Sequence, residues 1–211
     1  MIVDLKLKGR KVAVIGGGEK AEFKIKKLLD SGAEVTVISS KFSKKIKELA
    51  DYVKIIKADE EEAVKIINHM KPYLLVAASG DRELDARVAD LVRNSCKLVY
   101  VEDNLDLSDF SMTAVAKLGD IRIAFSTNGL SPAMSKLLRE RVEKLITKED
   151  IMMVKLHGII RSKIRRKIKS EEERRAVTYK ILRNRRIRQL VKRGMLNEAI
   201  KYAEEIINVR L

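Results

Sequence analysis

A glycine-rich segment near the N-terminus has the residue types and spacing of a nucleotide-binding loop. Gly16, Gly18 and Ala21 fit the pattern G-x-G-x-x-A, directly after the apolar run 12–15. The first glycine permits a tight turn, the second lets the backbone approach a pyrophosphate, and a small third residue lets helix and strand pack closely. Backbone N–H groups at the helix start then offer partial positive charge to the phosphates. The segment predicts a bound dinucleotide, and the alternative is a purely structural strand-to-helix turn.

The residues expected to hold the ribose differ from those of most dehydrogenases. About 20 residues after such a loop, an Asp or Glu usually accepts the ribose hydroxyls. Here the chain reads Ser39-Ser40-Lys41 instead. The serines can still hydrogen-bond a ribose, and Lys41 is either a partner for the 2′-phosphate of NADP or an ordinary solvated lysine. This motif alone leaves the choice between NAD and NADP open.

Around this loop, short apolar runs alternate with helical patterns. Because nearly every residue of each run is apolar, the strands are expected to be covered on both faces. The alternation predicts an α/β fold, a Rossmann-like parallel sheet with helices on both sides. The expected strands are Val12–Ile15, Val35–Ile38, Val53–Ile56, Leu74–Ala78 and Leu98–Val101, and the expected helices are Glu19–Ser31, Lys41–Ala50, Glu60–Met70 and Asp81–Ser95. The last helix carries a predicted apolar stripe of Leu84, Val88, Leu91 and Val92.

The pattern changes after residue 110. Two β-like runs, Ser111–Ala116 and Ile121–Ser126, flank Gly119-Asp120 and predict a hairpin. Ser131-Pro132 then reads as an N-cap followed by proline at the first helical position. Further helices are expected over 133–147, 150–168, 171–192 and 196–208. The chain is thus expected to comprise a nucleotide-binding sheet domain (1–110), a hairpin and helix (111–147) and a basic helical domain (148–211).

The net charge of +15 is concentrated in the second part of the chain. Residues 133–211 carry 23 Lys and Arg against 10 Asp and Glu, whereas the first 132 residues carry 22 against 20. A basic region of this kind favours a polyanionic partner: a nucleic acid, an anionic lipid or a small molecule with many carboxylates.

Several classes of protein are disfavoured by the composition. A single cysteine, Cys96, excludes an internal disulfide, and two histidines, His69 and His157, are too few for a standard zinc site. We therefore expect no metal site. No apolar run approaches the roughly 18 residues of a membrane span, and the start lacks the apolar region of a secretory signal. A cytoplasmic protein without membrane association is expected.

Five segments, in order, resemble the precorrin-2 dehydrogenase family, the dehydrogenase and ferrochelatase module of sirohaem synthesis. They are VIGGGEKAEFK (14–24), GAEVTVIS (32–39), LLVAASGDRELDARV (74–88), VYVEDNLDLSDF (99–110) and IAFSTNGLSPAMSKLLRERVE (123–143). The last is the most specific, because a generic nucleotide-binding fold does not require it. Two departures, SDFSMTA (108–114) for the usual CDFxxPA and STNG (126–129) for STGG, concern substrate geometry more than the fold.

The resemblance implies an NAD-dependent oxidation of precorrin-2, a tetrapyrrole polycarboxylate, to sirohydrochlorin. It also implies that Asp103, just after the fifth expected strand, is catalytic. A carboxylate beside the nicotinamide can accept a proton as a general base, although Asp106 and Asp109 lie close by in the sequence. Some family members also insert iron, but no pair of ligands for the metal is visible here, so chelatase activity is left open.

The resemblance, together with the glycine pattern, gives a set of expected contacts. Cofactor contacts are expected from Gly16, Gly17, Gly18, Glu19, Lys20, Ala21, Ser39, Ser40, Lys41 and Ala78. Substrate contacts are expected from Ser126, Thr127, Asn128, Ser131 and Arg139. Because related proteins pair through the hairpin region, a homodimer is also expected.

A binding module is the main alternative to an enzyme. In that interpretation a nucleotide-sensing sheet domain is joined to a basic helical region that holds nucleic acid. The aromatic content of 4% removes most base-stacking platforms but not phosphate contacts. Since no helix-turn-helix pattern stands out, we expect no nucleic-acid partner.

Overall fold

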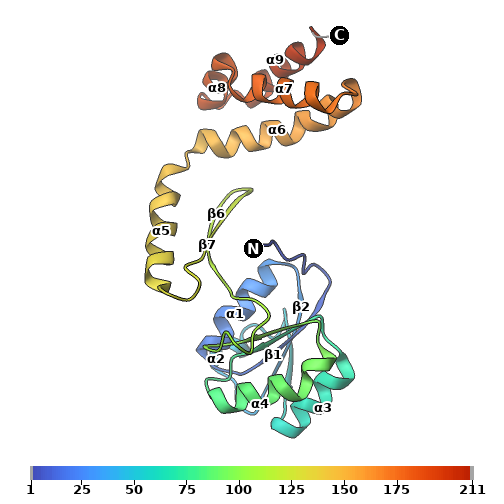
Figure 1. Ribbon diagram of the computed structural model, residues 1–211, viewed down its shortest axis with the longest axis vertical. Coiled ribbons are helices and arrows are strands. Elements are labelled where there is room, and N and C mark those ends of the chain that lie inside the picture. Colours follow the sequence, from blue (N-terminus) through green and yellow to red (C-terminus); the bar gives the residue numbers. More distant parts are fainter. Residues whose placement is uncertain (1, 210–211) are drawn as a thin grey trace. The chain divides into compact units, whose positions relative to one another are not determined.

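The computed structural model describes residues 2–209 in two compact units, and the boundary between them in the chain falls between Met112 and Thr113 (Figure 1). The part up to Met112 is called the sheet unit below, and the part from Thr113 onward is called the helical unit. Each has its own hydrophobic core, and each is described by itself.

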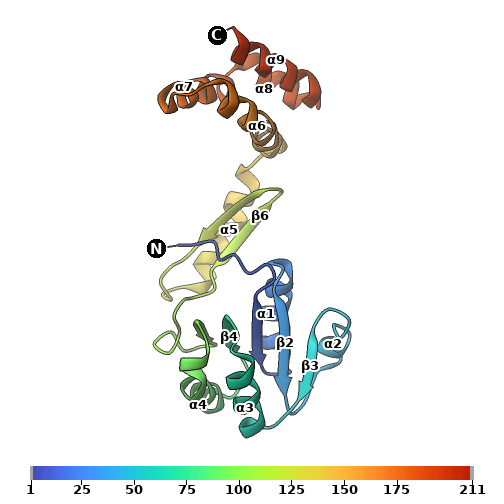
Figure 2. The ribbon, with the colours of Figure 1, turned by 90° about the vertical axis from the view of Figure 1, so that its right-hand side faces the viewer.

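Five parallel strands form the centre of the sheet unit (Figure 2). They lie in the order β3-β2-β1-β4-β5, so that β1 is central. Strands β2 and β3 lie on one side of β1, and β4 and β5 lie on the other. The strands are β1 (Lys11–Ile15), β2 (Glu34–Ser39), β3 (Lys54–Lys57), β4 (Leu74–Ala77) and β5 (Leu98–Val101). This arrangement confirms the predicted Rossmann-like sheet.

Alternate residues of the strands point to opposite faces of the sheet, and both faces are covered. Val12 and Val14 of β1 pack beneath helix α1 (Glu19–Asp30), whereas Ala13 and Ile15 pack beneath α3 (Glu60–Met70) and α4 (Arg82–Val92). Because no face of the sheet meets water, the strands are apolar at nearly every position.

Two details of the sheet unit differ from the sequence-based expectation. The expected helix 41–50 is reduced to α2 (Lys44–Lys47), because the backbone N–H of Ser43 donates to the carbonyl of Gly17 at 2.8 Å and keeps the preceding residues non-helical. The apolar stripe of α4 is also rotated. Leu91 is exposed, and the buried residues of α4 are Asp85, Val88, Ala89 and Val92.

The helical unit begins with the hairpin β6 (Ala114–Leu118) and β7 (Ile121–Phe125), against which α5 (Pro132–Leu145) packs. The turn is at Gly119, whose φ of +60° favours glycine. The first strand starts three residues later than expected. The reason is that Phe110 and Met112 pack against the core of the sheet unit instead of joining the hairpin.

Four further helices share a second hydrophobic core. They are α6 (Lys148–Lys167), α7 (Glu171–Leu182), α8 (Arg185–Lys192) and α9 (Leu196–Asn208). The single helix expected over 171–192 is wrong, because it breaks at Asn184. The Asn184 side chain accepts a hydrogen bond from the N–H of Ile187 at 3.1 Å and so starts a new helix. Among residues 2–209, no helix has the length and apolar character needed to cross a membrane.

Candidate active site

The loops that carry most of the predicted site residues meet at one edge of the parallel sheet. Carboxyl ends of parallel strands lie on the same side, and ligands bind in the crevice where the strand order reverses. Here the strand order reverses between β1 and β4. The ends of β1, β2, β4 and β5 and the loops that follow them supply Gly16–Gly18, Ser39–Lys41, Ala78–Asp81 and Glu102-Asp103, respectively.

The glycine loop is pressed against its neighbours. A Cβ atom on Gly16, whose φ is +119°, would lie 2.4 Å from the carbonyl oxygen of Ala78. A Cβ on Gly17 would lie 1.8 Å from the carbonyl oxygen of Lys41 and 3.0 Å from Oγ of Ser39. The loop after β1 is therefore fixed between the loops after β4 and β2, and no side chain fits at either glycine.

Gly18 has a different environment. It is the N-cap of α1 and is exposed, and apart from its own chain neighbours no atom of the described residues lies within 4 Å of the position its Cβ would take. Within residues 2–209 no side chain caps this helix, whereas Ser43, Asp59 and Asp81 cap α2, α3 and α4. The N–H groups at the start of α1 thus face open space, which fits the phosphates of a dinucleotide.

The end of β2 lies beside this loop. Ser39 is half-buried near Gly17, whereas Ser40 and Lys41 are exposed. Hydroxyl and ammonium groups therefore occupy the place where an acidic residue usually binds a ribose. Of the other expected cofactor residues, Glu19 is exposed on the first turn of α1 and Ala21 is buried against the sheet.

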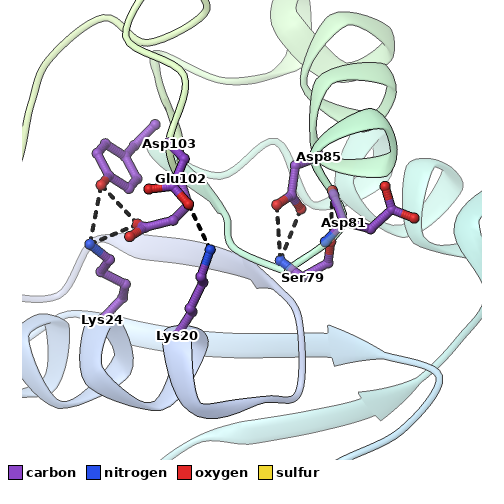
Figure 3. A network of polar contacts seen from close by, with 8 residues as sticks. Lys20, Lys24, Ser79, Asp81, Asp85, Glu102 and Asp103 are labelled. Carbon is purple, nitrogen blue, oxygen red and sulfur yellow. Dashed lines mark hydrogen bonds and ion pairs between the residues drawn. The ribbon is translucent and has the colours of Figure 1, made fainter.

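An ion pair joins the start of α1 to the end of β5 (Figure 3). Nζ of Lys20 lies 2.6 Å from Oδ2 of Asp103, and both side chains are about half exposed. The hydrogen bond and charge of Lys20 lower the pKa of the Asp103 carboxyl. Asp103 has a φ of +59°, a left-handed conformation that is uncommon outside glycine and that directs its side chain. The sequence-predicted catalytic residue is therefore an ionised carboxylate beside a predicted cofactor residue.

A second ion pair lies beside the first and is more buried. Nζ of Lys24, one helical turn after Lys20, lies 2.7 Å from Oε2 of Glu102 and 3.1 Å from the hydroxyl of Tyr100. That hydroxyl donates to Glu102 at 2.8 Å, and burial is the main reason that its pKa is raised. Lys24 and Glu102 are largely buried, with exposed side-chain fractions of 9% and 18%. These buried contacts connect α1 to β5 and to the residue that follows it.

Substituting Lys24 by methionine is expected to lower the free energy of unfolding by about 3 kcal/mol, because it leaves Glu102 charged, buried and unpaired. Urea denaturation would measure the change. Lys6→Met is the matched control, because it removes an exposed pair with Asp4 and should cost less than about 1 kcal/mol. Adding Glu102→Gln to Lys24→Met should recover part of the loss; a double variant no more stable than Lys24→Met would contradict this explanation.

A buried carboxylate that the sequence analysis missed holds the loop after β4. Asp85 is 2% exposed and accepts the backbone N–H of Ser79 at 2.9 and 3.1 Å. Burial raises its pKa, which the hydrogen bonds from the loop oppose. Ala78 of the same loop contacts Gly16. Asp85 therefore supports the glycine loop indirectly, by holding the loop after β4 that lies against it. Its spacing of three residues before Val88 and seven before Val92 was the sequence signal for its burial.

Asp109, one of the nearby acids considered for catalysis, has a structural place instead. Its carboxylate accepts the backbone N–H of Val99 at 2.6 Å and pairs with Arg93 at 2.8 Å. It thereby closes the loop after β5 onto the strand. Asp106 is exposed in the same loop.

The expected substrate residues are in the helical unit, before and within α5. Oγ1 of Thr127 accepts the N–H of Ser131 at 3.1 Å, and Oγ of Ser131 caps α5 by accepting the N–H of Met134. Ser126 accepts the N–H of Asn128, whose φ is +54°. The loop is therefore a folded turn with Asn128 exposed at its tip.

Arg139 lies on α5 and is about one-third exposed. Its guanidinium group is 3.7 Å from Glu140 and 3.6 Å from Glu143, and its Nε is buried with no hydrogen-bond partner in the part of the chain that the structure describes.

Among residues 2–209, no group of three or more His, Cys, Asp or Glu side chains is placed to hold a metal ion.

Comparison with known proteins identifies the family. Residues 3–114 match a family of proteins described as putative NAD(P)-binding. A precorrin-2 dehydrogenase of Methanosarcina barkeri is 31% identical over 185 residues, which cover 84% of this chain and 80% of that protein. The chain belongs to the precorrin-2 dehydrogenase family. The resemblance noted in the sequence is thereby confirmed. The sheet unit of the chain belongs to a class of domains that bind a nicotinamide cofactor.

Other members of the precorrin-2 dehydrogenase family include longer proteins. A siroheme synthase of Neisseria meningitidis serogroup C (strain 053442) is 35% identical over 193 residues, which cover 92% of this chain. The chain spans about two fifths of the length of such relatives, 40% in this case. A solved structure described as SirC, precorrin-2 dehydrogenase, shares the fold, with a TM-score of 0.74 over 97% of this chain and 99% of the other at 23% identity.

Proposed function

We propose that this chain catalyses the NAD-dependent oxidation of precorrin-2 to sirohydrochlorin. The observation that carries the proposal is the ionised carboxylate of Asp103, held at the carboxyl edge of the sheet by Lys20. It lies at the same edge as the uncapped start of α1, where a dinucleotide would bind. The Methanosarcina barkeri relative supports the choice of substrate.

The reaction removes a hydride and a proton from the reduced macrocycle. When bound, the nicotinamide cofactor supplies the hydride acceptor. The cation left on the macrocycle must then lose a proton, and the Asp103 carboxylate accepts it as a general base before releasing it to water. Gly18 and the first turn of α1 would hold the phosphates, and Ser39 and Ser40 the ribose.

The substrate is a polycarboxylate, and the helical unit is strongly basic. Arginine binds carboxylates in bidentate fashion. We propose that the turn 126–131 and Arg139 contact the substrate, with Ser126 and Asn128 exposed for a direct contact. Thr127 and Ser131 hold the shape of the turn through their mutual hydrogen bonds.

NAD is the proposed cofactor. The hydroxyl of Ser39 lies against the glycine loop and can bind the ribose without an acidic residue. Fluorescence titration with NADH and NADPH would test this choice, and tighter binding of NADPH would overturn it.

As a step of cofactor biosynthesis that uses NAD, the reaction is assigned to the cytoplasm in this proposal.

A homodimer through the hairpin and α5 is part of the proposal. Exposed apolar side chains occur on these elements and in the loop between them: Val115, Leu130, Met134, Leu137 and Leu145. Sedimentation of the purified protein should give twice the chain mass of 24.0 kDa. A fully active monomer would contradict this part of the proposal.

The decisive assay is anaerobic. Purified protein, precorrin-2 and NAD are mixed, and the absorption spectrum of sirohydrochlorin is followed together with NADH formation. No product above the uncatalysed background would reject the proposed function. A parallel reaction of sirohydrochlorin with Fe²⁺ or Co²⁺ tests metal insertion, which we do not propose for this chain.

A further inference from the structure

Lys20 and Asp103 are 83 positions apart in the sequence but in direct contact at the mouth of the sheet (Figure 3). Lys20 is the second residue of α1, and Asp103 follows β5. Strand β4 lies between β1 and β5 in the sheet, so the ion pair links elements that follow the strands on either side of β4.

An exposed ion pair alone stabilises a protein little, because two flexible side chains must be ordered to form it. This pair rests on a buried one. Lys24 and Glu102 are each next to a member of the exposed pair, Lys24 one helical turn after Lys20 and Glu102 immediately before Asp103. The buried pair fixes both backbones, and the left-handed conformation of Asp103 fixes the direction of its side chain.

We propose that Lys20 is a positioning residue for Asp103: its ammonium group, 2.6 Å from Oδ2, holds the carboxylate directed toward the start of α1. The inference rests on the proposed role of Asp103 as proton acceptor. It adds that this acceptor is set by a lysine within the glycine-loop motif, a residue otherwise expected only to contact the cofactor.

The charges around Asp103 agree with this role. Lys20 is the main cause of its lowered pKa, burial acts in the opposite direction, and Arg82 of α4 and Lys24 of α1 contribute further lowering. Asp103 in turn is the main cause that raises the pKa of Lys20. Glu102, in the same loop as Asp103, is the adjacent acid and is paired with Lys24. A base whose pKa is lowered stays deprotonated at lower pH, so removing Lys20 should make Asp103 protonate at higher pH.

Carbon-13 NMR titration of aspartate carboxyls in the ligand-free protein tests the inference directly, with Asp103→Asn to assign the signal. In Lys20→Met the Asp103 signal should titrate at higher pH than in the natural protein, and in Lys20→Arg it should titrate as in the natural protein. Lys6→Met removes a comparably short exposed pair outside the site and should leave the signal unchanged. An unchanged Asp103 titration in Lys20→Met would overturn the inference.

Kinetics give a second readout. The acidic limb of the pH profile of kcat/KM should move to higher pH in Lys20→Met, with a loss of about two- to fivefold on that limb. The Lys20→Arg variant should restore the limb, which a lost packing contact would not explain. If the natural protein fails to oxidise precorrin-2, the proposed function falls, whereas the NMR titration still decides whether Lys20 controls Asp103.

Discussion

Asp103→Asn is expected to lower kcat for precorrin-2 oxidation by about 10²- to 10⁴-fold, the range that general bases contribute. Asparagine keeps the shape of the side chain but cannot accept the proton. The acidic limb that reports this carboxylate should also vanish from the pH profile. Single-turnover assays with saturating NAD would measure the loss at the chemical step.

Two controls separate chemistry from folding. NADH affinity of Asp103→Asn should stay within about threefold of the natural protein, because the residue is placed on the substrate side of the reaction. Asp106→Asn changes an exposed acid in the same loop and should keep kcat within about twofold. An Asp103→Asn variant that turns over at the natural rate would end the proposed mechanism.

The second large effect concerns two adjacent glycines with opposite environments. Gly17→Ala is expected to lower the free energy of unfolding by about 3 kcal/mol, because its Cβ would meet the Lys41 carbonyl oxygen at 1.8 Å and the loops must move apart. Gly18→Ala should change stability by less than about 0.5 kcal/mol, because its φ of −99° suits alanine and the space beside it is open.

Although Gly18→Ala should leave stability almost unchanged, it should weaken cofactor binding strongly. Its methyl group would fill the space through which the backbone approaches the pyrophosphate, so NADH affinity should fall at least about tenfold. Urea denaturation and NADH fluorescence titration of both variants measure the two effects. A Gly18→Ala variant that binds NADH normally would show that the dinucleotide does not pass over this loop.

The elements of the sheet unit were largely predictable, because their signals are local. Strands buried on both faces are apolar throughout, and the glycine pattern marks the turn between β1 and α1. Errors arose where a side chain or backbone group from elsewhere decided the outcome. The contact of Ser43 with Gly17 shortens α2 in this way. Asn184 is a local exception: it divides an expected helix by capping its second half three residues away, a signal that the helical periodicity did not show.

The class of fold, the position of the glycine loop and the concentration of positive charge after residue 132 follow from the amino-acid sequence alone. The resemblance to a family adds the prediction that Asp103 is catalytic. The folded chain adds that Lys20 pairs with Asp103, that Lys24 and Glu102 form a second ion pair beside them, and that Asp85 holds the loop after β4. The physical reason is that periodicity and turn preferences act over a few residues. Contacts across the sheet edge depend on strand order, which brings residues 83 positions apart within hydrogen-bonding distance.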